Sequence, residues 1–183
     1  MRKIALLNKA ITRQGSEVAD SETFADAYQL HLYAVFNYCL FRVQDRDLAE
    51  DLAADTFERA WQNRHRYNPD RAAFQTWLLT IARNIVTDWQ RSQTRRPLAR
   101  LTDQQPSSAP LFEVRLEESE LQSRLRQLIQ TLEAQEQELI ALKFGAGLNN
   151  REIARAIDKS ETAVGSSLHR AMKKLRAQWK ELE

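Results

Sequence analysis

Hydrophobic positions recur at three- and four-residue steps through most of this chain. Three such stripes follow one another between Ser21 and Arg91: Leu32, Val35, Phe36, Cys39 and Leu40; Leu48, Leu52, Phe57 and Trp61; and Phe74, Trp77, Leu78, Ile81, Ile85 and Trp89. This spacing places apolar side chains on one face of a helix, so we predict a helical block over residues 21–91. The break at Tyr67-Asn68-Pro69-Asp70 predicts a loop, because proline disfavours helix at the residue before it.

The helical pattern stops after residue 91 and resumes near residue 121. The stretch 92–120 holds three of the four prolines, Pro97, Pro106 and Pro110, with polar residues between them. Such a composition cannot bury much surface and is typical of a linker. Residues 1–20 are weakly patterned, and we expect a flexible leader there. The sequence therefore predicts an all-α protein, with two small helical domains at 21–91 and 121–183 joined by a flexible linker at 92–120.

Composition supports this fold class, and charge adds a functional hint. Hydrophobic residues make up 43% of the 183 positions, and there are only four glycines, so packed helices are favoured over a β-rich fold. The net charge is only +2, but acidic residues gather between Asp45 and Glu58 and basic ones between Arg83 and Arg100 and near the C-terminus. Segregated charge indicates one acidic surface that faces a protein and two basic surfaces that can meet phosphates. Each run can also simply solvate a helix face.

Several classes of site lack the residues they would need. Cys39 is the only cysteine, so no internal disulfide forms, and we expect a buried structural thiol and no metal site. His31, His65 and His169 are scattered, and no glycine-rich phosphate loop occurs, so an enzyme is disfavoured and no cofactor is expected. No apolar run is long enough to span a bilayer. We expect a cytoplasmic protein without membrane insertion.

The sharpest local signal lies between Leu148 and Leu175. Asn149 with Glu152 predicts a capping box that opens one helix, and Ser160 predicts the N-cap of a second helix after a tight turn at Asp158-Lys159. Four residues give the second helix its buried stripe: Val164, Leu168, Ala171 and Leu175. Two helices around a tight turn, the second with a basic tail, match the plan of a DNA-binding helix-turn-helix. An ordinary helical hairpin is the alternative.

Two sets of motifs together resemble one protein family. The series Ala49-Glu50-Asp51-Leu52, Asp55, Phe57, Ala60-Trp61, Phe74, Trp77-Leu78 and Ile81-Ala82-Arg83-Asn84 resembles region 2 of extracytoplasmic-function (ECF) sigma factors. Leu132, Leu139, Leu142 and the helix-turn-helix resemble region 4 of the same family. The resemblance implies a promoter-recognition subunit of bacterial RNA polymerase. Its implied partners are core polymerase (the largest-subunit coiled coil and the flap region), promoter DNA and an anti-sigma factor.

The resemblance also implies three binding surfaces. The first grips core polymerase and is formed by Asp47, Glu50, Asp51 and Asp55, with Leu52, Phe57 and Trp61 holding their helix in the core. The second opens and reads the −10 element and comprises Tyr67 and Asn84, which capture a base, with Arg71, Arg83 and Arg91 near the backbone. Phe74 and Trp77 can line this pocket or belong to the core, and we favour the core for Trp77.

The third implied surface reads the −35 element on the second helix of the helix-turn-helix. It comprises Ser166, His169, Arg170, Lys173 and Lys174, of which the two lysines are expected on phosphates. Here the sequence departs from the family pattern, since Gly165 and Ser167 stand where basic residues are usual, and Glu161 adds a negative charge. We therefore expect weak or altered −35 binding.

Two other classes of protein are alternatives to this family. A response-type transcription regulator can carry the same C-terminal motif, but it needs a sensor domain, and the N-terminal half lacks the strand-like alternation of a receiver. An enzyme lacks support for the reasons given above.

Overall fold

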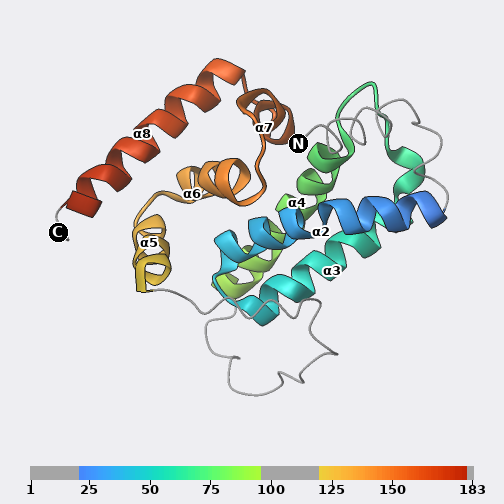
Figure 1. Cartoon of the computed structure of the whole chain (residues 1–183), viewed down its shortest axis with the longest axis horizontal. Coiled ribbons are helices and arrows are strands. Elements are labelled where there is room, and N and C mark those ends of the chain that lie inside the picture. The colour runs from blue at the N-terminus through green and yellow to red at the C-terminus, as the bar shows by residue number, and fades with distance from the viewer. Residues whose placement is uncertain (1–20, 96–119, 181–183) are drawn as a thin grey trace.

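The computed structural model describes residues 21–95 and 120–180, and every element in these ranges is a helix (Figure 1). The all-α prediction is confirmed. The predicted leader and nearly all of the predicted linker, including Arg96 and Arg100, lie outside the described residues. We call residues 21–95 the N-terminal unit and residues 120–180 the C-terminal unit.

The N-terminal unit is a bundle of three long helices. It contains α2 (Ser21–Val43), α3 (Arg46–Gln62), the short 3-10 turn η2 (Arg64–Arg66) and α4 (Phe74–Arg95). Asp45 caps α3, because its side chain accepts a hydrogen bond from the Leu48 amide at 3.1 Å. The loop predicted around Pro69 is present between η2 and α4.

Helix α4 continues four residues further than the sequence pattern indicated. The linker was expected to begin at residue 92, but α4 ends at Arg95, two residues before Pro97. The restriction that proline places on the residue before it accounts for an end at this point. The prolines therefore mark the end of the helix, whereas the polar residues before them do not.

The C-terminal unit contains four α-helices and a π-helical turn. These are α5 (Glu120–Gln130), α6 (Ala134–Ile140), the turn η3 (Ala141–Gly145), α7 (Asn150–Ile157) and α8 (Glu161–Lys180). The expected capping box is present: Asn149 Oδ1 accepts from the Glu152 amide at 3.0 Å, and Glu152 Oε2 accepts from the Asn149 amide at 2.8 Å. Asp158 makes the turn with φ of 54°, and Ser160 Oγ accepts from the Ala163 amide at 3.1 Å. The helix-turn-helix is confirmed as a local structure.

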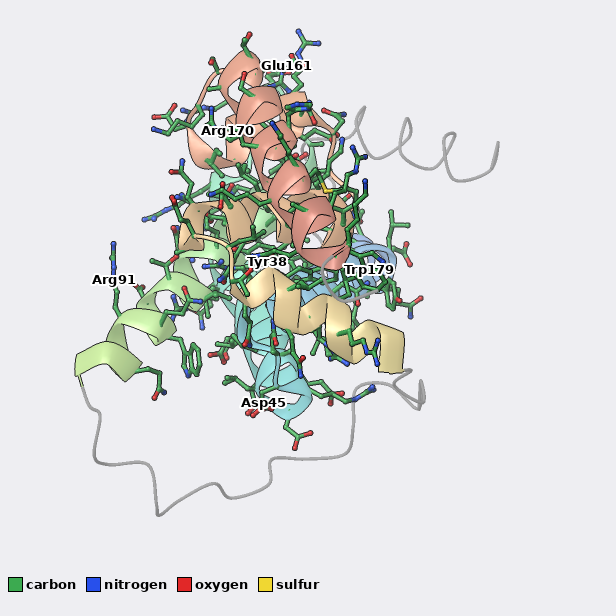
Figure 2. The ribbon with its side chains drawn as sticks, turned by 90° about the vertical axis from the view of Figure 1, so that its left-hand side faces the viewer. Tyr38, Asp45, Arg91, Glu161, Arg170 and Trp179 are labelled. Carbon is green, nitrogen blue, oxygen red and sulfur yellow. The ribbon has the colours of Figure 1, made fainter. Side chains whose placement is uncertain are left out.

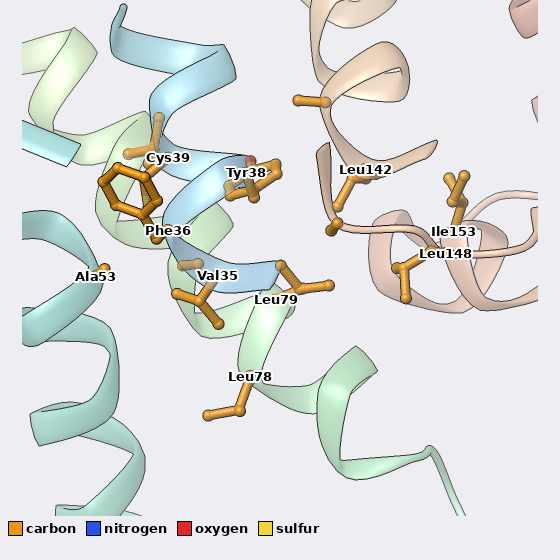
Figure 3. Packing of buried hydrophobic residues seen from close by; sticks show 14 of the residues in the cluster. Val35, Phe36, Tyr38, Cys39, Ala53, Leu78, Leu79, Leu142, Leu148 and Ile153 are labelled. Carbon is orange, nitrogen blue, oxygen red and sulfur yellow. The ribbon is translucent and has the colours of Figure 1, made fainter. Parts of the chain in front are cut away.

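The two units share one hydrophobic core. Tyr38 of α2 and Leu79 of α4 are buried facing the C-terminal unit, which contributes Leu142, Leu148 and Ile153, each at most 2% exposed (Figure 3). Helix α2 packs against η3, and α4 packs against α7. The sequence left the relative placement of the units undetermined. In the structure they pack directly against each other, and we call this the closed arrangement.

None of the helices in the described ranges combines the length and the apolar character that crossing a membrane requires.

Candidate protein and nucleic-acid interfaces

Helix α3 presents an acidic face on the side opposite its buried stripe. Leu52 and Phe57 are buried and Trp61 packs against the core, as expected. The expected acids that lie on the exposed face, spaced four residues apart, are Asp47, Asp51 and Asp55. Residues four apart are neighbours on a helix, so these carboxylates form one stripe that can meet cations on a partner helix.

Glu50 differs from the other three expected acids. Its side chain is only 12% exposed, and it pairs with Arg46 at 3.1 Å within the same helix. Asp45 caps the N-terminus of α3, where its side chain accepts a hydrogen bond from the Leu48 amide. Figure 2 labels Asp45, at the start of α3, near the bottom of the molecule and Arg170 of α8 near the top, so these two residues lie far apart.

The expected base-capture residues lie in contrasting surroundings. Asn84 is exposed on α4, whereas Tyr67 is 9% exposed and packs its ring against Phe74 at 5.1 Å and Trp77 at 5.3 Å between centroids. Burial raises the pKa of Tyr67. Phe74 is buried at 2% and Trp77 is partly buried against the core, which agrees with the core assignment of Trp77. Tyr67, Phe74 and Trp77 therefore form an aromatic cluster whose rings contact one another.

The three arginines expected near the −10 backbone also differ from one another. Arg71 is exposed in the loop, and Arg91 is exposed on α4 with Asp88 at 3.8 Å. Arg83 instead forms an ion pair with Glu138 of the C-terminal unit, from Nε to Oε1 at 2.6 Å. Two of the three arginines thus face solvent, and the third is engaged across the interface.

The outer face of α8 carries four of the five residues expected to meet duplex DNA. Val164, Leu168, Ala171 and Leu175 are buried as predicted, which turns Ser166, His169, Arg170 and Lys173 outward. Arg170 Nη2 donates to Ser167 Oγ at 3.0 Å, so its guanidinium lies along the helix. A Cβ atom at Gly165 would lie 3.7 Å from Asn150 Nδ2 of α7, an ordinary contact. Gly165 therefore borders α7, at the edge of the outer face.

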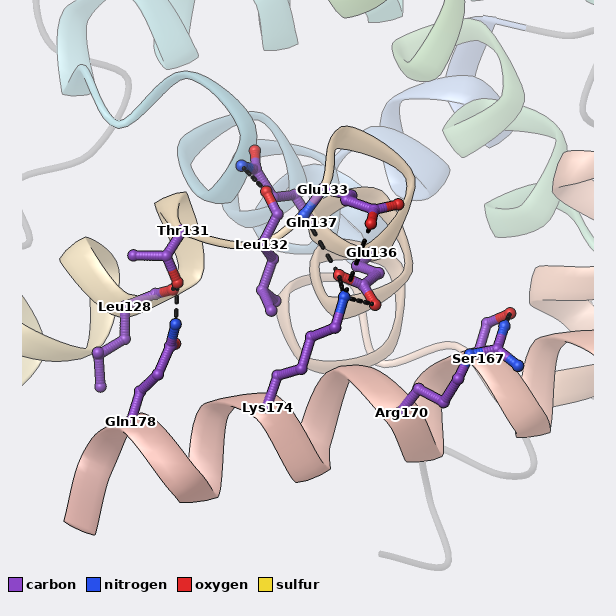
Figure 4. A network of polar contacts seen from close by, with 10 residues as sticks. All are labelled: Leu128, Thr131, Leu132, Glu133, Glu136, Gln137, Ser167, Arg170, Lys174 and Gln178. Atoms are coloured by element: carbon purple, nitrogen blue, oxygen red, sulfur yellow. Dashed lines mark hydrogen bonds and ion pairs between the residues drawn. The ribbon is translucent and has the colours of Figure 1, made fainter. Parts of the chain in front are cut away.

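Lys174, the fifth expected DNA contact, is engaged inside the unit (Figure 4). Its Nζ lies 2.8 Å from Glu136 Oε1 and 3.7 Å from Glu133 Oε1, so it ties α8 to α6. Hydrogen bonding to Glu136 raises the pKa of Lys174. Burial alone would raise the pKa of Glu136, but the hydrogen bonds from Lys174 and the Glu133 amide leave that pKa below its ordinary value. Lys174 thus has a structural role that sequence reasoning missed.

Sequence reasoning also missed an open groove beside α8. It is lined by Lys143, Phe144, Asn150, Leu168, His169, Met172 and Arg176, with a volume of about 310 Å³. Phe144 is 55% exposed, and basic side chains surround this apolar floor. The available signal for the groove in the sequence was Phe144, an aromatic residue that does not continue the buried stripe of Leu139 and Leu142. The groove suits an apolar segment that carries acidic residues.

Both units match families of known proteins. Residues 27–96 match the family described as Sigma-70 region 2, and residues 122–175 match Sigma-70, region 4. The chain is 31% identical over 164 residues to the ECF RNA polymerase sigma factor BldN of Streptomyces coelicolor, covering 87% of this chain and 61% of that protein. It is 28% identical over 170 residues to the ECF RNA polymerase sigma factor SigL of Mycobacterium tuberculosis, covering 92% of this chain and 95% of that protein.

The fold is also shared with solved structures. The sigma factor RpoE, in a co-crystal structure with the anti-sigma factor NepR from Bartonella quintana, superposes with a TM-score of 0.70 at 23% identity, covering 87% of this chain and 98% of that one. The structure of CnrH in complex with the cytosolic domain of CnrY gives a TM-score of 0.68 at 22% identity, covering 94% and 98%. The arrangement of helices described above is therefore a known one.

Proposed function

Since this chain belongs to the ECF group of the sigma-70 family, we propose that it binds core RNA polymerase and directs it to specific promoters. The observation that carries the proposal is the presence, in one chain, of a region 2 bundle with an acidic helix and a region 4 helix-turn-helix. The chain itself supplies binding surfaces, and the polymerase performs the chemistry. Its place of action is the cytoplasm, where core polymerase and promoters are found.

The acidic stripe of α3 is proposed to grip the coiled coil of the largest polymerase subunit. The stripe consists of Asp47, Asp51 and Asp55. Glu50 lies about one helical turn after Asp47 and is paired with Arg46. Carboxylates on a rigid helix can pair with arginine or lysine on a partner helix without any rearrangement of the bundle. The groove beside Phe144, with its basic rim, is proposed to hold the flap region.

The two DNA surfaces are proposed to act on separate promoter elements. In the N-terminal unit, Asn84 and the aromatic cluster around Tyr67 capture an unpaired base of the −10 element, and Arg71, Arg83 and Arg91 contact its backbone. In the C-terminal unit, the outer face of α8 meets the −35 duplex. We assign these two functional modules to residues 21–91 and 121–183.

An anti-sigma factor is proposed to hold the chain inactive. Support comes from the likeness to the sigma factor RpoE, whose co-crystal structure contains the anti-sigma factor NepR. Such a partner acts by covering the surfaces that polymerase and DNA require.

Replacement of Asp51 and Asp55 by alanine tests the proposed grip. We expect the double variant to bind core polymerase about tenfold more weakly, because two desolvated charge pairs are lost. The double variant Asp26→Ala/Asp70→Ala removes the same net charge at exposed positions away from the stripe and should bind as the wild type does. Affinity for core is measured by fluorescence titration, and start-site selection by run-off transcription on a promoter library. Wild-type protein that does not bind core, or binds it without selecting start sites, would refute the proposed function.

A further inference from the structure

We propose that two arginines of α7, Arg151 and Arg155, bind phosphates of the DNA duplex and supply charge that α8 lacks. The inference rests on the proposed function of the helix-turn-helix as a duplex-binding surface. It adds a contact surface on the first helix of that motif, and it gives this surface the role of positioning the chain on DNA.

The first two turns of α8 contain no basic residue. Residues 161–168 carry one charged side chain, and it is the carboxylate of Glu161. In a helix-turn-helix this N-terminal part of the second helix contacts the base edges. Its hydroxyl groups can donate hydrogen bonds, but they attract phosphate far less than a cation does. Duplex binding through this part of α8 alone is therefore expected to be weak.

Several basic residues further along α8 are engaged within the protein. Arg170 Nη2 donates to Ser167 Oγ at 3.0 Å, and Lys174 Nζ lies 2.8 Å from Glu136 Oε1. Arg176 lines the groove beside Phe144. Helix α8 therefore offers duplex DNA fewer available cations than its sequence suggests.

Helix α7, in contrast, carries two exposed arginines on one face. Arg151 and Arg155 are four residues apart, which makes them neighbours on a helix, and Ile153 between them is buried on the other side. In the part of the chain that the structure describes, neither guanidinium group forms a hydrogen bond or an ion pair. The carboxylate of Glu152 accepts instead from the Asn149 amide at 2.8 Å, as part of the capping box. Both arginines are therefore available to a ligand.

The start of α7 lies beside the part of α8 that lacks a cation. A Cβ atom at Gly165 would lie 3.7 Å from Asn150 Nδ2, and Asn150 directly precedes Arg151. The two helices also pack against each other along their length. Arg155 lies about one helical turn further along α7, towards the tight turn that leads into α8. Cations on α7 can therefore act next to the positions where α8 has none.

The plan of the motif places such residues on the DNA backbone. The first helix of a helix-turn-helix crosses the backbone while the second lies in the major groove. A guanidinium group can pair with phosphate through two parallel hydrogen bonds. Contacts of this kind fix the position of a protein on the duplex, but they do not read its sequence. We therefore expect this motif to hold DNA through the charge on α7 and to discriminate weakly between sequences.

Neutral substitution of the two arginines tests the inference on the full-length chain. Arg151→Gln/Arg155→Gln removes both cations and keeps the helix, because glutamine and arginine have similar helix propensities. The conservative variant Arg151→Lys/Arg155→Lys keeps the charge. The control Arg124→Gln/Lys180→Gln removes the same charge from exposed positions on α5 and at the last residue of α8. Figure 1 shows α7 beside the start of α8 and α5 near its other end.

Fluorescence anisotropy with 30-base-pair duplexes of two unrelated sequences measures affinity over a range of salt concentrations. We expect the glutamine variant to bind about tenfold more weakly at about 0.1 M salt, and to flatten the plot of log affinity against log salt by about 2, because two phosphate contacts are lost. The loss should be equal on the two sequences. The lysine variant and the control should keep the wild-type salt slope.

Charge placed on α8 should restore what α7 loses. Addition of Gly165→Arg/Ser167→Arg to the glutamine variant should return the salt slope to near its wild-type value, because the slope depends on the number of phosphates neutralised. A slope that stays at the value of the glutamine variant would show that the two helices do not serve one DNA surface, and it would contradict the inference.

Circular dichroism checks that each variant keeps its helices. The single variants Arg151→Gln and Arg155→Gln should each flatten the salt plot by about 1, and they keep the test decisive if the double variant does not fold. The inference is overturned by a glutamine variant with the wild-type salt slope, by a lysine variant or control that loses as much, or by wild-type protein that does not bind duplex DNA. Binding to core polymerase, which the glutamine variant should retain, is measured separately and decides the proposed function.

Discussion

At the scale of single residues, His31 is buried on α2 in an apolar setting. It is 6% exposed, and its ring centroid lies 5.7 Å from that of Phe74. Burial lowers the pKa of His31 to about 4, from an ordinary value of 6.5. Between these two values the unfolded chain binds a proton that the folded chain does not, so the free energy of unfolding falls as pH is lowered.

The His31→Leu variant tests this dependence on pH. Between pH 7 and pH 5 the wild type should lose about 2 kcal/mol of stability through His31, and the variant should lack this loss. His65→Leu, at an exposed position of η2, should keep the wild-type dependence. Urea unfolding at the two pH values measures the difference, and equal pH slopes for wild type and His31→Leu would contradict the expectation.

At the scale of elements, α8 has a regular buried stripe, but two positions on or beside its outer face, Gly165 and Ser167, carry no charge. Gly165 lowers helix stability by up to about 1 kcal/mol relative to alanine, and Ser167 is occupied by the Arg170 guanidinium. A side chain at Gly165 has room, because its Cβ would make only an ordinary contact with Asn150. Helix α8 can therefore accept basic residues at positions 165 and 167, where this chain has Gly165 and Ser167.

The double variant Gly165→Arg/Ser167→Arg should bind duplex DNA more tightly than wild type. Two added phosphate contacts steepen the plot of log affinity against log salt by about 2, because each contact releases condensed counterions. Fluorescence anisotropy with a 30-base-pair duplex of random sequence, over a range of salt concentrations, measures both quantities. The uncharged double variant Gly165→Ala/Ser167→Ala serves as the control. An unchanged salt slope in the arginine variant would contradict the expectation that missing charge at these two positions weakens binding to the −35 element.

Elements with local signals were predicted well from the sequence. The capping box at Asn149 and Glu152, the Ser160 cap and the buried stripe of α8 depend on residues within one or two turns of each other. The end of α4 was misplaced because polar residues continue a helix as readily as they begin a linker. Lys174 was assigned to DNA because nothing near it in sequence reveals Glu136, which lies 38 positions away.

At the scale of the whole molecule, the shared core should make the two units unfold together. Leu142 of η3 is fully buried beside Tyr38 of the other unit (Figure 3). Leu142→Ala should lower stability by about 2–5 kcal/mol through lost burial and a residual cavity. Because the cavity borders both units, the N-terminal unit should be destabilised as well.

A Trp179→Phe background makes this measurable, since Trp61, Trp77 and Trp89 then report the N-terminal unit alone. Leu142→Ala should move the urea midpoint of tryptophan fluorescence in that background together with the midpoint of circular dichroism. Leu125→Ala, at a position 43% exposed, should change stability by less than about 0.5 kcal/mol. A fluorescence midpoint that Leu142→Ala leaves in place would show that the units unfold independently.

The sequence could not predict this closed arrangement. Tyr38, Leu79 and Leu142 are ordinary core residues in any helical pattern, and periodicity does not say which helix each faces. Gln75 and Arg42 bind main-chain carbonyls, an interaction that leaves no trace in the partner's side chain. The three proposed binding surfaces rest on family likeness, whereas the contact between the two units became visible only in three dimensions.

The apolar seam between the units has a consequence for how the molecule is held together. We expect a single cleavage of the backbone between residues 95 and 120 to leave the two units bound to each other. The buried contacts of Tyr38 and Leu79 with the C-terminal unit do not depend on an intact chain between the units. Either half on its own would instead expose these apolar residues to water and would be prone to aggregate.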